Sequence, residues 1–354
     1  MISKIEAVVF DWGNTLMQVF SEFNGPMATW PKVEAVPQIH AGLDALKGSA
    51  RLLLATNASD SGSAQVRAAL ERVDLAGYFD VIYTSRELGV CKPDFEFFER
   101  IQKDQQLAPQ QLVMVGDSYT ADILGAHAAG WRTAWYTPAM QPCESLLPLN
   151  DVQLMEMSEL SQLLAGLPLP GLETILRWLQ EQSCSHFLLE HVNKVAAIAY
   201  FLACRLRRNG FAVDPILAHR GGLLHDVAKI SGKTNDRNSS DHGLDGGRFL
   251  EARNQHDLAE ISQRHMLFNL EVPERMPLTW EQKVVFFADK LVETGSVVTI
   301  EERIAGLQKR YKIPPVDVAR NKPALEALQA EICTACGIQP SELVPVITAA
   351  MQGH

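Results

Sequence analysis

Several features that define other protein classes are scarce in this chain of 354 residues. Its six cysteines, at positions 91, 143, 184, 204, 333 and 336, are too scattered for a disulfide-stabilised scaffold. No stretch reaches about 18 consecutive apolar residues, and the apolar run near the N-terminus ends at Asp11, too early for a signal peptide or a membrane helix. We therefore expect a reduced, cytoplasmic protein with no membrane partner.

Positive charge is also in deficit. Lys and Arg number 32 against 42 Asp and Glu, so the formal net charge is −10, and the chain has no long basic run. This balance argues against an extended nucleic-acid-binding face, although a local pocket in an acidic protein can still bind a small phosphorylated substrate. Hydrophobic residues make up 47% and charged residues 21%, which is typical of a globular protein and excludes extensive disorder.

The chain length predicts two domains, and the residue pattern changes between them. In residues 1–140, short apolar runs alternate with helical patterns, which predicts an α/β domain with a Rossmann-like parallel sheet. Residues 141–171 are rich in proline and are expected to form a linker. Residues 172–354 have helical periodicity and predict an all-α domain, while nothing in the sequence indicates an oligomeric state. The predicted strands are Ile5–Phe10, Arg51–Ala55, Val81–Thr84, Leu112–Val115 and Thr133–Tyr136.

Polar side chains gather at the ends of the predicted strands, at the edge where open α/β sheets place their ligands. They are Asp11 after AVVF, Thr56 after LLLA, Lys92 ahead of a helix, and Asp117 after LVMV, with Asp122 five residues further on. Carboxylate oxygens suit a hard cation, and a carboxylate can also act as a nucleophile. A lysine and a hydroxyl can stabilise a phosphoryl group. The set therefore predicts a site for phosphoryl transfer.

The segments FDWGNTL, ATNAS, GVCKPD and GDSYTAD resemble, in order and strand context, the motifs of the haloacid dehalogenase-like phosphohydrolases over roughly residues 5–137. The resemblance implies that Asp11 is the nucleophile and forms an aspartyl-phosphate. It also implies that Thr56 and Lys92 bind the phosphoryl oxygens. The Mg²⁺ ligands that it implies are Asp11, the backbone carbonyl of Gly13, Asp117 and Asp122.

Position 13 departs from the usual pattern of these phosphatases, which carry a second Asp there as general acid and base. Gly13 offers no proton donor, and losing one costs on the order of 10²–10⁴ in rate unless water or another group substitutes. The stretch from Leu16 to Leu46 is also too short for a large helical cap, so we expect a minimal cap or none. Two interpretations stay open for this half, a working phosphatase site and a catalytically weak sensor of a phosphate ligand.

The helical half contains six potential metal ligands. Imidazoles suit transition metals such as Mn, Fe, Ni and Zn, and an intervening carboxylate can bridge two ions. A metal ion on rigid helices activates water as a nucleophile near neutral pH. The usual alternative for a single histidine is a buried structural role. The six residues are His191, His225, Asp226, His242, His265 and Asp289.

LLHDVAK followed by FFADKLVE resembles the HD family of metal-dependent phosphohydrolases, named for its adjacent His-Asp pair, over roughly residues 190–310. The resemblance implies that Lys229, one helical turn after Asp226, faces the substrate phosphate. His242 and His265 match the extra histidines of members that bind two metals, so one or two divalent transition metals are expected. The core metal ligands that it implies are His191, His225, Asp226 and Asp289.

The two halves together predict a metal-dependent phosphohydrolase that acts on a nucleotide or a similar small phosphorylated metabolite. The helical half is its principal catalyst in this interpretation. In the main alternative, the first domain is a phosphate sensor that regulates an HD hydrolase. A third interpretation is a metal- and nucleotide-binding interaction protein with both sites silent. Arg303, beyond the last motif, is expected in a solvated salt bridge.

Overall fold

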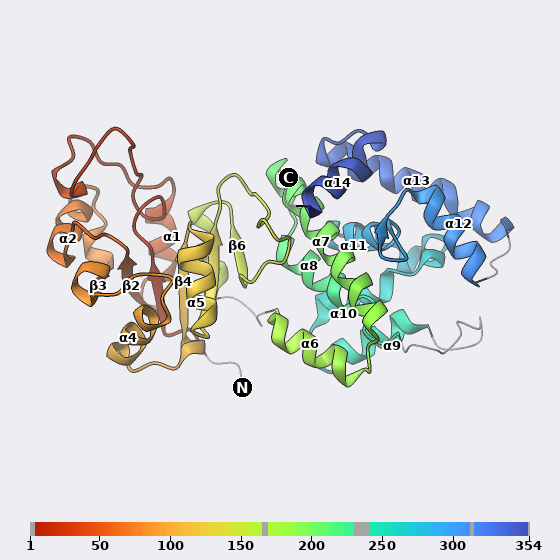
Figure 1. Ribbon diagram of the computed structural model, residues 1–354, viewed down its shortest axis with the longest axis horizontal. Helices are drawn as coiled ribbons and strands as arrows, with labels where there is room; N and C mark the ends of the chain where they lie inside the picture. Colours follow the sequence, from red (N-terminus) through yellow and green to blue (C-terminus); the bar gives the residue numbers. More distant parts are fainter. Residues whose placement is uncertain (1–3, 165–168, 230–240, 312–314, 353–354) are drawn as a thin grey trace. The chain divides into compact units, whose positions relative to one another are not determined.

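The computed structural model describes residues 4–164, 169–229, 241–311 and 315–352, with the backbone alone at positions 310, 311 and 315–319. The chain divides into two compact units (Figure 1). The first comprises Met1–Ala139 and Leu149–Pro168, and the second comprises Met140–Pro148 and Leu169–His354.

A six-stranded parallel sheet forms the centre of the first unit, in the order β3-β2-β1-β4-β5-β6. Five of these strands lie where the apolar runs predict them, so the predicted α/β class is confirmed. The strand order reverses between β1 and β4, and such a switch point is where open α/β sheets bind ligands. The strands are β1 (Ala7–Phe10), β2 (Arg51–Thr56), β3 (Val81–Thr84), β4 (Leu112–Gly116), β5 (Arg132–Tyr136) and β6 (Val152–Leu154).

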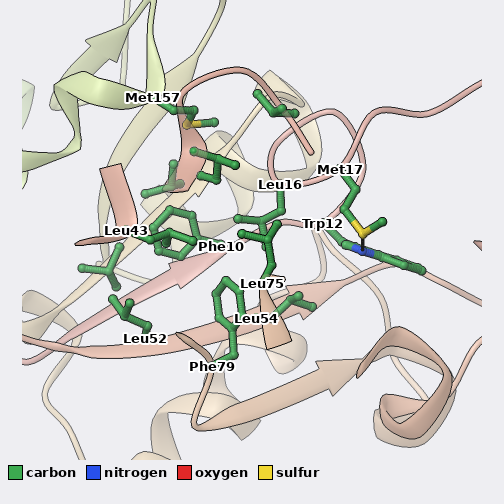
Figure 2. Close-up of a cluster of buried hydrophobic side chains, with 14 of the residues drawn as sticks. Phe10, Trp12, Leu16, Met17, Leu43, Leu52, Leu54, Leu75, Phe79 and Met157 are labelled. Carbon is green, nitrogen blue, oxygen red and sulfur yellow. Dashed lines mark hydrogen bonds between the residues drawn. The ribbon is translucent and has the colours of Figure 1, made fainter. Parts of the chain in front are cut away.

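Alternate side chains of β1 pack against helices on opposite faces of the sheet. Val8 and Phe10 lie in the apolar core that contains residues of α1 (Ile39–Leu46) and α2 (Ser63–Glu71), and Figure 2 shows part of this core around Phe10. Ala7 and Val9 lie in the core that contains residues of α4 (Phe95–Gln105) and α5 (Gly125–Ala128). Because both faces of β1 are fully buried, the strand holds the following residue, Asp11, in a rigid position.

The shorter helical segments of the first unit are η1 (Met27–Thr29), η2 (Ala76–Tyr78), α3 (Ser85–Leu88), η3 (Pro109–Gln111), η4 (Tyr119–Leu124) and η5 (Met157–Leu164).

The segment between β1 and α1 is a compact loop. Its helical content is the three-residue turn η1, as its short length led us to expect. Met17 bridges to Gly13 and Ala35, and Arg72 at the end of α2 donates to the carbonyl of Trp30 at 2.7 Å. The loop is therefore tied to α2.

The segment 141–171, which proline content predicts to be a linker, is largely built into the two units. Val152–Leu154 forms β6, which pairs with β5, and buried residues of η5 join the core around α1. Residues 140–148 belong to the second unit. A three-residue strand is too short to show an alternating pattern, which explains why the sequence did not reveal it.

The second unit is helical, as predicted. Its described residues also include one antiparallel pair of two-residue strands, β7 (Val292–Glu293) and β8 (Ser296–Val297). The helices are α6 (Leu172–Glu181), α7 (His186–Arg208), α8 (Pro215–Leu224), α9 (His242–Glu251), α10 (His256–Arg264), α11 (Trp280–Asp289), α12 (Ile300–Tyr311), α13 (Pro315–Cys336) and α14 (Leu343–Met351). Short turns are η6 (Leu267–Glu271), η7 (Pro273–Arg275) and η8 (Pro340–Glu342).

Helix α7 is the central helix of this unit. Ser185 caps its first turn by accepting the backbone N–H of Leu188. Among the described residues it is the one helix that is long and apolar enough to cross a membrane by composition, but 56% of its most apolar window is buried inside the protein. Its contacts with α8 and α11 explain this apolar character as core packing.

Candidate metal-binding sites

Lys92 lies at the centre of the first site. Its ammonium group donates to Asp11 Oδ1 at 2.7 Å, to Asp122 Oδ1 at 2.6 Å and to the Ala55 carbonyl at 2.8 Å. The side-chain amide of Asn57 donates to the Lys92 carbonyl and accepts from the Lys92 N–H, each at 2.8 Å. Because an ammonium group has three donors, all three are used within the site.

Three carboxylates surround this lysine. Oxygens of Asp11, Asp117 and Asp122 lie within 4.8 Å of one another. Asp11 follows β1 and Asp117 follows β4, and these strands are neighbours in the sheet. Asp122 lies in η4, where its Oδ2 accepts the N–H of Ser118 at 3.1 Å. Its close approach needs the glycine at position 116, since a Cβ on Gly116 would lie 2.2 Å from Asp122 Oδ2.

The charges in this site fit a divalent cation. Burial raises the pKa of Asp122 to about 7, and the Asp11 charge adds to this shift while Lys92 opposes it. Burial also raises the pKa of Asp117, again with a contribution from Asp11. Burial would lower the pKa of Lys92, but Asp11 and Asp122 outweigh it, so the lysine stays charged. Three carboxylates exceed one ammonium by two negative charges, which an oxygen-seeking ion such as Mg²⁺ would offset.

Two threonines complete the first site. The buried hydroxyl of Thr15 lies 3.4 Å from Asp11 Oδ2 and 3.4 Å from Asp117 Oδ1, and it accepts the Asp117 N–H at 3.2 Å. Thr56, the last residue of β2, accepts the N–H of Ala58 at 3.2 Å. Thr15 was not selected from the sequence because a threonine does not stand out without the contacts that the fold creates, whereas Asn57 follows Thr56 directly at the end of the same predicted strand.

Helix ends bring together the six potential ligands of the second unit. Each residue is at least half-buried, and all but one lie at or next to the end of a helix. His191 is on α7, His225 and Asp226 follow α8, His242 begins α9, His265 follows α10 and Asp289 ends α11.

Asp226 is the centre of this set, and its two oxygens face different histidines. Oδ2 lies 3.5 Å from His225 Nε2 and 3.8 Å from His191 Nε2. Oδ1 lies 3.1 Å from His242 Nε2 and 3.2 Å from His265 Nε2. The potential ligands therefore form two groups of three that share this carboxylate, and within each group the ligand atoms lie within 4.8 Å of one another. The groups are His191, His225 and Asp226, and Asp226, His242 and His265. A shared carboxylate of this kind suits a pair of metal ions.

Asp289 lies on the side of His191. Its Oδ1 is 3.0 Å from His191 Nε2 and 3.4 Å from an Arg303 nitrogen, and its Oδ2 pairs with Lys290. Arg303 is 7% exposed and also pairs with Glu293, so the expectation of a solvated salt bridge is wrong. The sequence did not reveal the turn between β7 and β8, which precedes α12. Arg303 lies on α12 and Glu293 lies on β7, so these two elements bring the pair together beside Asp289.

The orientation of the imidazole rings fits metal ligation. His225 Nδ1 donates to the Gly222 carbonyl at 2.8 Å, and His265 Nδ1 donates to the Ser262 carbonyl at 2.6 Å. This tautomer leaves the Nε2 lone pairs directed at Asp226. Among the described residues, the buried atoms His191 Nε2, His225 Nε2 and Asp226 Oδ1 have no hydrogen bond of acceptable geometry. Such atoms are rare in proteins, and a metal ion would give all three a partner.

Protonation states point the same way. Burial lowers the pKa of His191, and it lowers that of His265 to about 4, so both rings are neutral at neutral pH. Burial would raise the pKa of Asp226, but Lys229 and the surrounding histidines together outweigh it and hold the carboxylate ionised. Burial of Asp289 is outweighed in the same way by Lys290, His191, His225 and Arg303 together, so its pKa is lowered as well. Neutral imidazole and ionised carboxylate are the forms that bind metal.

Lys229 lies where a substrate could reach it. Its ammonium group is 2.6 Å from Asp226 Oδ2, and its side chain is 33% exposed. The lysine therefore offsets the charge of Asp226 from a partly exposed position.

Comparison with known proteins distinguishes the same two regions. The family model described as haloacid dehalogenase-like hydrolase matches residues 5–136, and that of the HD domain matches residues 188–293. An uncharacterized protein of Methanocaldococcus jannaschii is 30% identical over 156 residues, which cover 41% of this chain and 85% of that protein. The pyrimidine 5′-nucleotidase YjjG of Escherichia coli is 37% identical over 125 residues, which cover 34% of this chain and 53% of that enzyme. The match thus spans about half of the nucleotidase.

One solved structure illustrates the structural comparison. The crystal structure of an uncharacterized protein from Listeria monocytogenes serotype 4b is 24% identical, with a TM-score of 0.40 over 44% of this chain and 95% of that chain.

Proposed function

The chain joins a haloacid dehalogenase-like hydrolase domain to an HD domain, and from this premise we propose that it is a metal-dependent phosphate-ester hydrolase with two active sites. The observation that carries the proposal is the shared Asp226 carboxylate, whose two oxygens face separate pairs of histidines. Four imidazole nitrogens around one buried carboxylate form a ligand set that suits divalent cations, and phosphate-ester hydrolysis is a chemistry that such a centre supports.

In the second unit, the six ligands would hold one or two divalent ions, with Asp226 common to both. When bound, these ions supply Lewis acidity that lowers the pKa of water and offsets the charge on the phosphoryl group. Mn, Fe, Ni and Zn all suit the mixed imidazole and carboxylate set. Lys229 would bind a phosphoryl oxygen with its exposed side, while Arg303 and Lys290 hold Asp289 in place.

In the first unit, Asp11 would attack the phosphorus atom and form an aspartyl-phosphate. Asp117, Asp122 and the Gly13 carbonyl would hold Mg²⁺ together with Asp11, since three clustered carboxylates suit a hard cation. Thr56 and Lys92 would bind the phosphoryl oxygens. Because all three donors of Lys92 are engaged, it must give up the Ala55 carbonyl or one carboxylate when substrate arrives.

We further propose that the substrate is a small phosphorylated compound, with a nucleotide as the leading candidate, and that the protein acts in the cytoplasm. The named activity of the matched nucleotidase supports a small substrate, and the net charge of −10 argues against a long nucleic acid.

The test measures phosphate release from nucleoside monophosphates and hydrolysis of bis(p-nitrophenyl) phosphate, with Mg²⁺, Mn²⁺ or Ni²⁺ added. Asp226→Asn is expected to abolish the activity of the HD site and leave the activity that depends on Asp11. Asp11→Asn is expected to do the reverse, so each variant is the control for the other. A full-length protein that retains its fold but hydrolyses none of these compounds with any of the three ions would contradict the proposal.

Gly13 favours a second candidate role for the first unit, as a phosphate-ligand sensor. A domain without a positioned general acid can bind phosphate and still turn over slowly. Hydrolysis at the HD site that changes with added inorganic phosphate in the wild type, but not in Asp11→Asn, would support sensing. Loss of a separate monoesterase activity in that variant would support catalysis.

A further inference from the structure

The contacts of Asp11 leave no free proton donor beside it. Lys92 directs its three donors at Asp11, Asp122 and the Ala55 carbonyl. The Thr15 hydroxyl is fully buried and lies between the carboxylates of Asp11 and Asp117. Among the described residues, these are the side chains that hydrogen-bond to Asp11. The Thr15 hydroxyl is directed at carboxylates, and the donor that Lys92 releases on substrate binding would bind an oxygen of the transferred phosphoryl group, not the leaving oxygen.

Position 13 has no side chain, and a side chain added there would be crowded by Val19. A Cβ on Gly13 would lie 3.0 Å from Val19 Cγ2, a distance at which the valine must move. The backbone N–H of Val19 donates to the Asn14 side chain at 3.1 Å, while the valine side chain is 47% exposed. An acid at position 13 would therefore have to displace a methyl group of Val19.

We infer that the first site acts on acyl phosphates or phosphoanhydrides and discriminates against alkyl phosphate monoesters. The inference rests on the proposed role of Asp11 as nucleophile. A carboxylate oxygen of Asp11 bonds to phosphorus while the bond from phosphorus to the leaving oxygen breaks. The leaving oxygen keeps the electron pair. A carboxylate or phosphate anion is stable in that state, whereas an alkoxide needs a proton. Among the described residues beside Asp11, Asp117 and Asp122 would be ionised ligands of the proposed Mg²⁺, and Lys92 and Thr15 are directed at carboxylates or at the phosphoryl group.

The second half of the reaction restores the enzyme. Water attacks the aspartyl-phosphate, inorganic phosphate departs, the Asp11 carboxylate is regenerated and the proton passes to solvent. Among the described residues, the carboxylates beside Asp11 are those of Asp117 and Asp122, which the proposed Mg²⁺ would engage. With neither available as a base for this water, the aspartyl-phosphate is expected to accumulate with a reactive donor. This specificity differs from the 5′-nucleotidase activity named for the matched protein of Escherichia coli.

The expected discrimination follows from the leaving groups. The conjugate acid of a carboxylate has a pKa of about 4 and that of a phenolate about 10, while an alcohol is near water at about 16. A positioned proton donor is worth on the order of 10²–10⁴ in rate, and only poor leaving groups need it. The Asp11-dependent kcat/KM is therefore expected to fall steeply along acetyl phosphate, phenyl phosphate and glycerol phosphate.

The experiment measures this series in the full-length protein with Mg²⁺ and subtracts the rates of Asp11→Asn. It then adds a donor at position 13 and room for it, in the double variant G13D/V19A. This variant is expected to raise the rate with glycerol phosphate about 10²-fold relative to that with acetyl phosphate. The matched control G13N/V19A has the same shape without the acid, and V19A alone tests the added room. In both, the ratio of the rate with glycerol phosphate to that with acetyl phosphate, and not the absolute rate, is expected to stay that of the wild type, because position 13 also supplies a proposed Mg²⁺ ligand.

Intact mass spectrometry supplies a readout independent of turnover. Acetyl phosphate is expected to add one phosphoryl group to the wild type and none to Asp11→Asn. Asp11-dependent rates that differ less than tenfold across the series, or a folded G13D/V19A that keeps the wild-type dependence, would overturn the inference and leave the proposed role of Asp11 standing. Absence of both an adduct and any Asp11-dependent hydrolysis would instead overturn that role, and the inference with it.

Discussion

Replacement of Asp226 is expected to remove more metal than replacement of any single histidine. Its Oδ1 faces His242 and His265, and its Oδ2 faces His191 and His225, so both candidate ligand groups depend on this one carboxylate. Asp226→Asn keeps the shape but loses the charge and one ligand atom. We expect about two metal equivalents in the wild type, about one in His242→Ala and none in Asp226→Asn.

The stability of the protein is expected to follow the metal content. An ion present at a hundredfold excess over its Kd stabilises the folded state by about 2.7 kcal/mol. In a unit of this size, each kcal/mol shifts the Tm by roughly 2–4 °C. Two ions therefore raise the Tm of the second unit by about 10–20 °C, one ion by about half as much, and Asp226→Asn shows no shift.

Elemental analysis of anaerobically purified protein gives the stoichiometry, and calorimetry with and without a chelator gives the shift. Each variant is compared with its own chelated form, because Asp226→Asn also leaves Lys229 without its 2.6 Å partner and lowers stability by itself. One full equivalent retained in Asp226→Asn would refute a shared carboxylate. Complete loss of metal in His242→Ala would refute two separable groups.

Two further predictions concern stability and the surroundings of Asp289. In metal-free protein, burial lowers the pKa of His265 to about 4, against about 6.5 in an unfolded chain. The unfolded state therefore takes up a proton first, and the free energy of unfolding falls by about 3 kcal/mol as the pH drops from about 6.5 to 4. Urea titrations across this range should show the loss and His265→Asn should flatten it, so an equal slope in that variant would contradict the assignment. Arg303→Ala removes the guanidinium shared by Asp289 and Glu293. It is expected to weaken metal binding about 10–100-fold, as measured by calorimetric titration, and Arg303→Lys is expected to keep part of the affinity. Unchanged affinity in Arg303→Ala would count against a positioning role.

The residues that carry the chemistry could be found in the sequence because their immediate neighbours are distinctive. Asp11 follows Ala-Val-Val-Phe and Asp117 follows Leu-Val-Met-Val-Gly, and short apolar runs of this kind predict strands of a parallel sheet. Parallel strands end at a common edge, so the two carboxylates were expected to meet there. The pairs of motifs were also specific enough to identify both families, and the family models confirm them.

Short elements and single contacts could not be found in this way. The strands β6, β7 and β8 have only two or three residues each, too few for a periodic pattern. Residues 140–148 contain prolines typical of a linker, yet Arg208 donates to the Met140 carbonyl and Arg220 to the Pro148 carbonyl within the second unit. Hydrogen bonds of this kind join residues about 70 positions apart in the chain, and no local pattern reports them.

The sequence by itself determined which residue types are available for catalysis and on which strands and helices they lie, because periodicity and motif order are local properties. Only the tertiary structure decided what these residues do together. It turned the two oxygens of Asp226 toward different histidines, used all three donors of Lys92 and placed Val19 over Gly13. These arrangements depend on distances of a few ångströms between side chains from separate elements, which are set by how the sheet and helices pack.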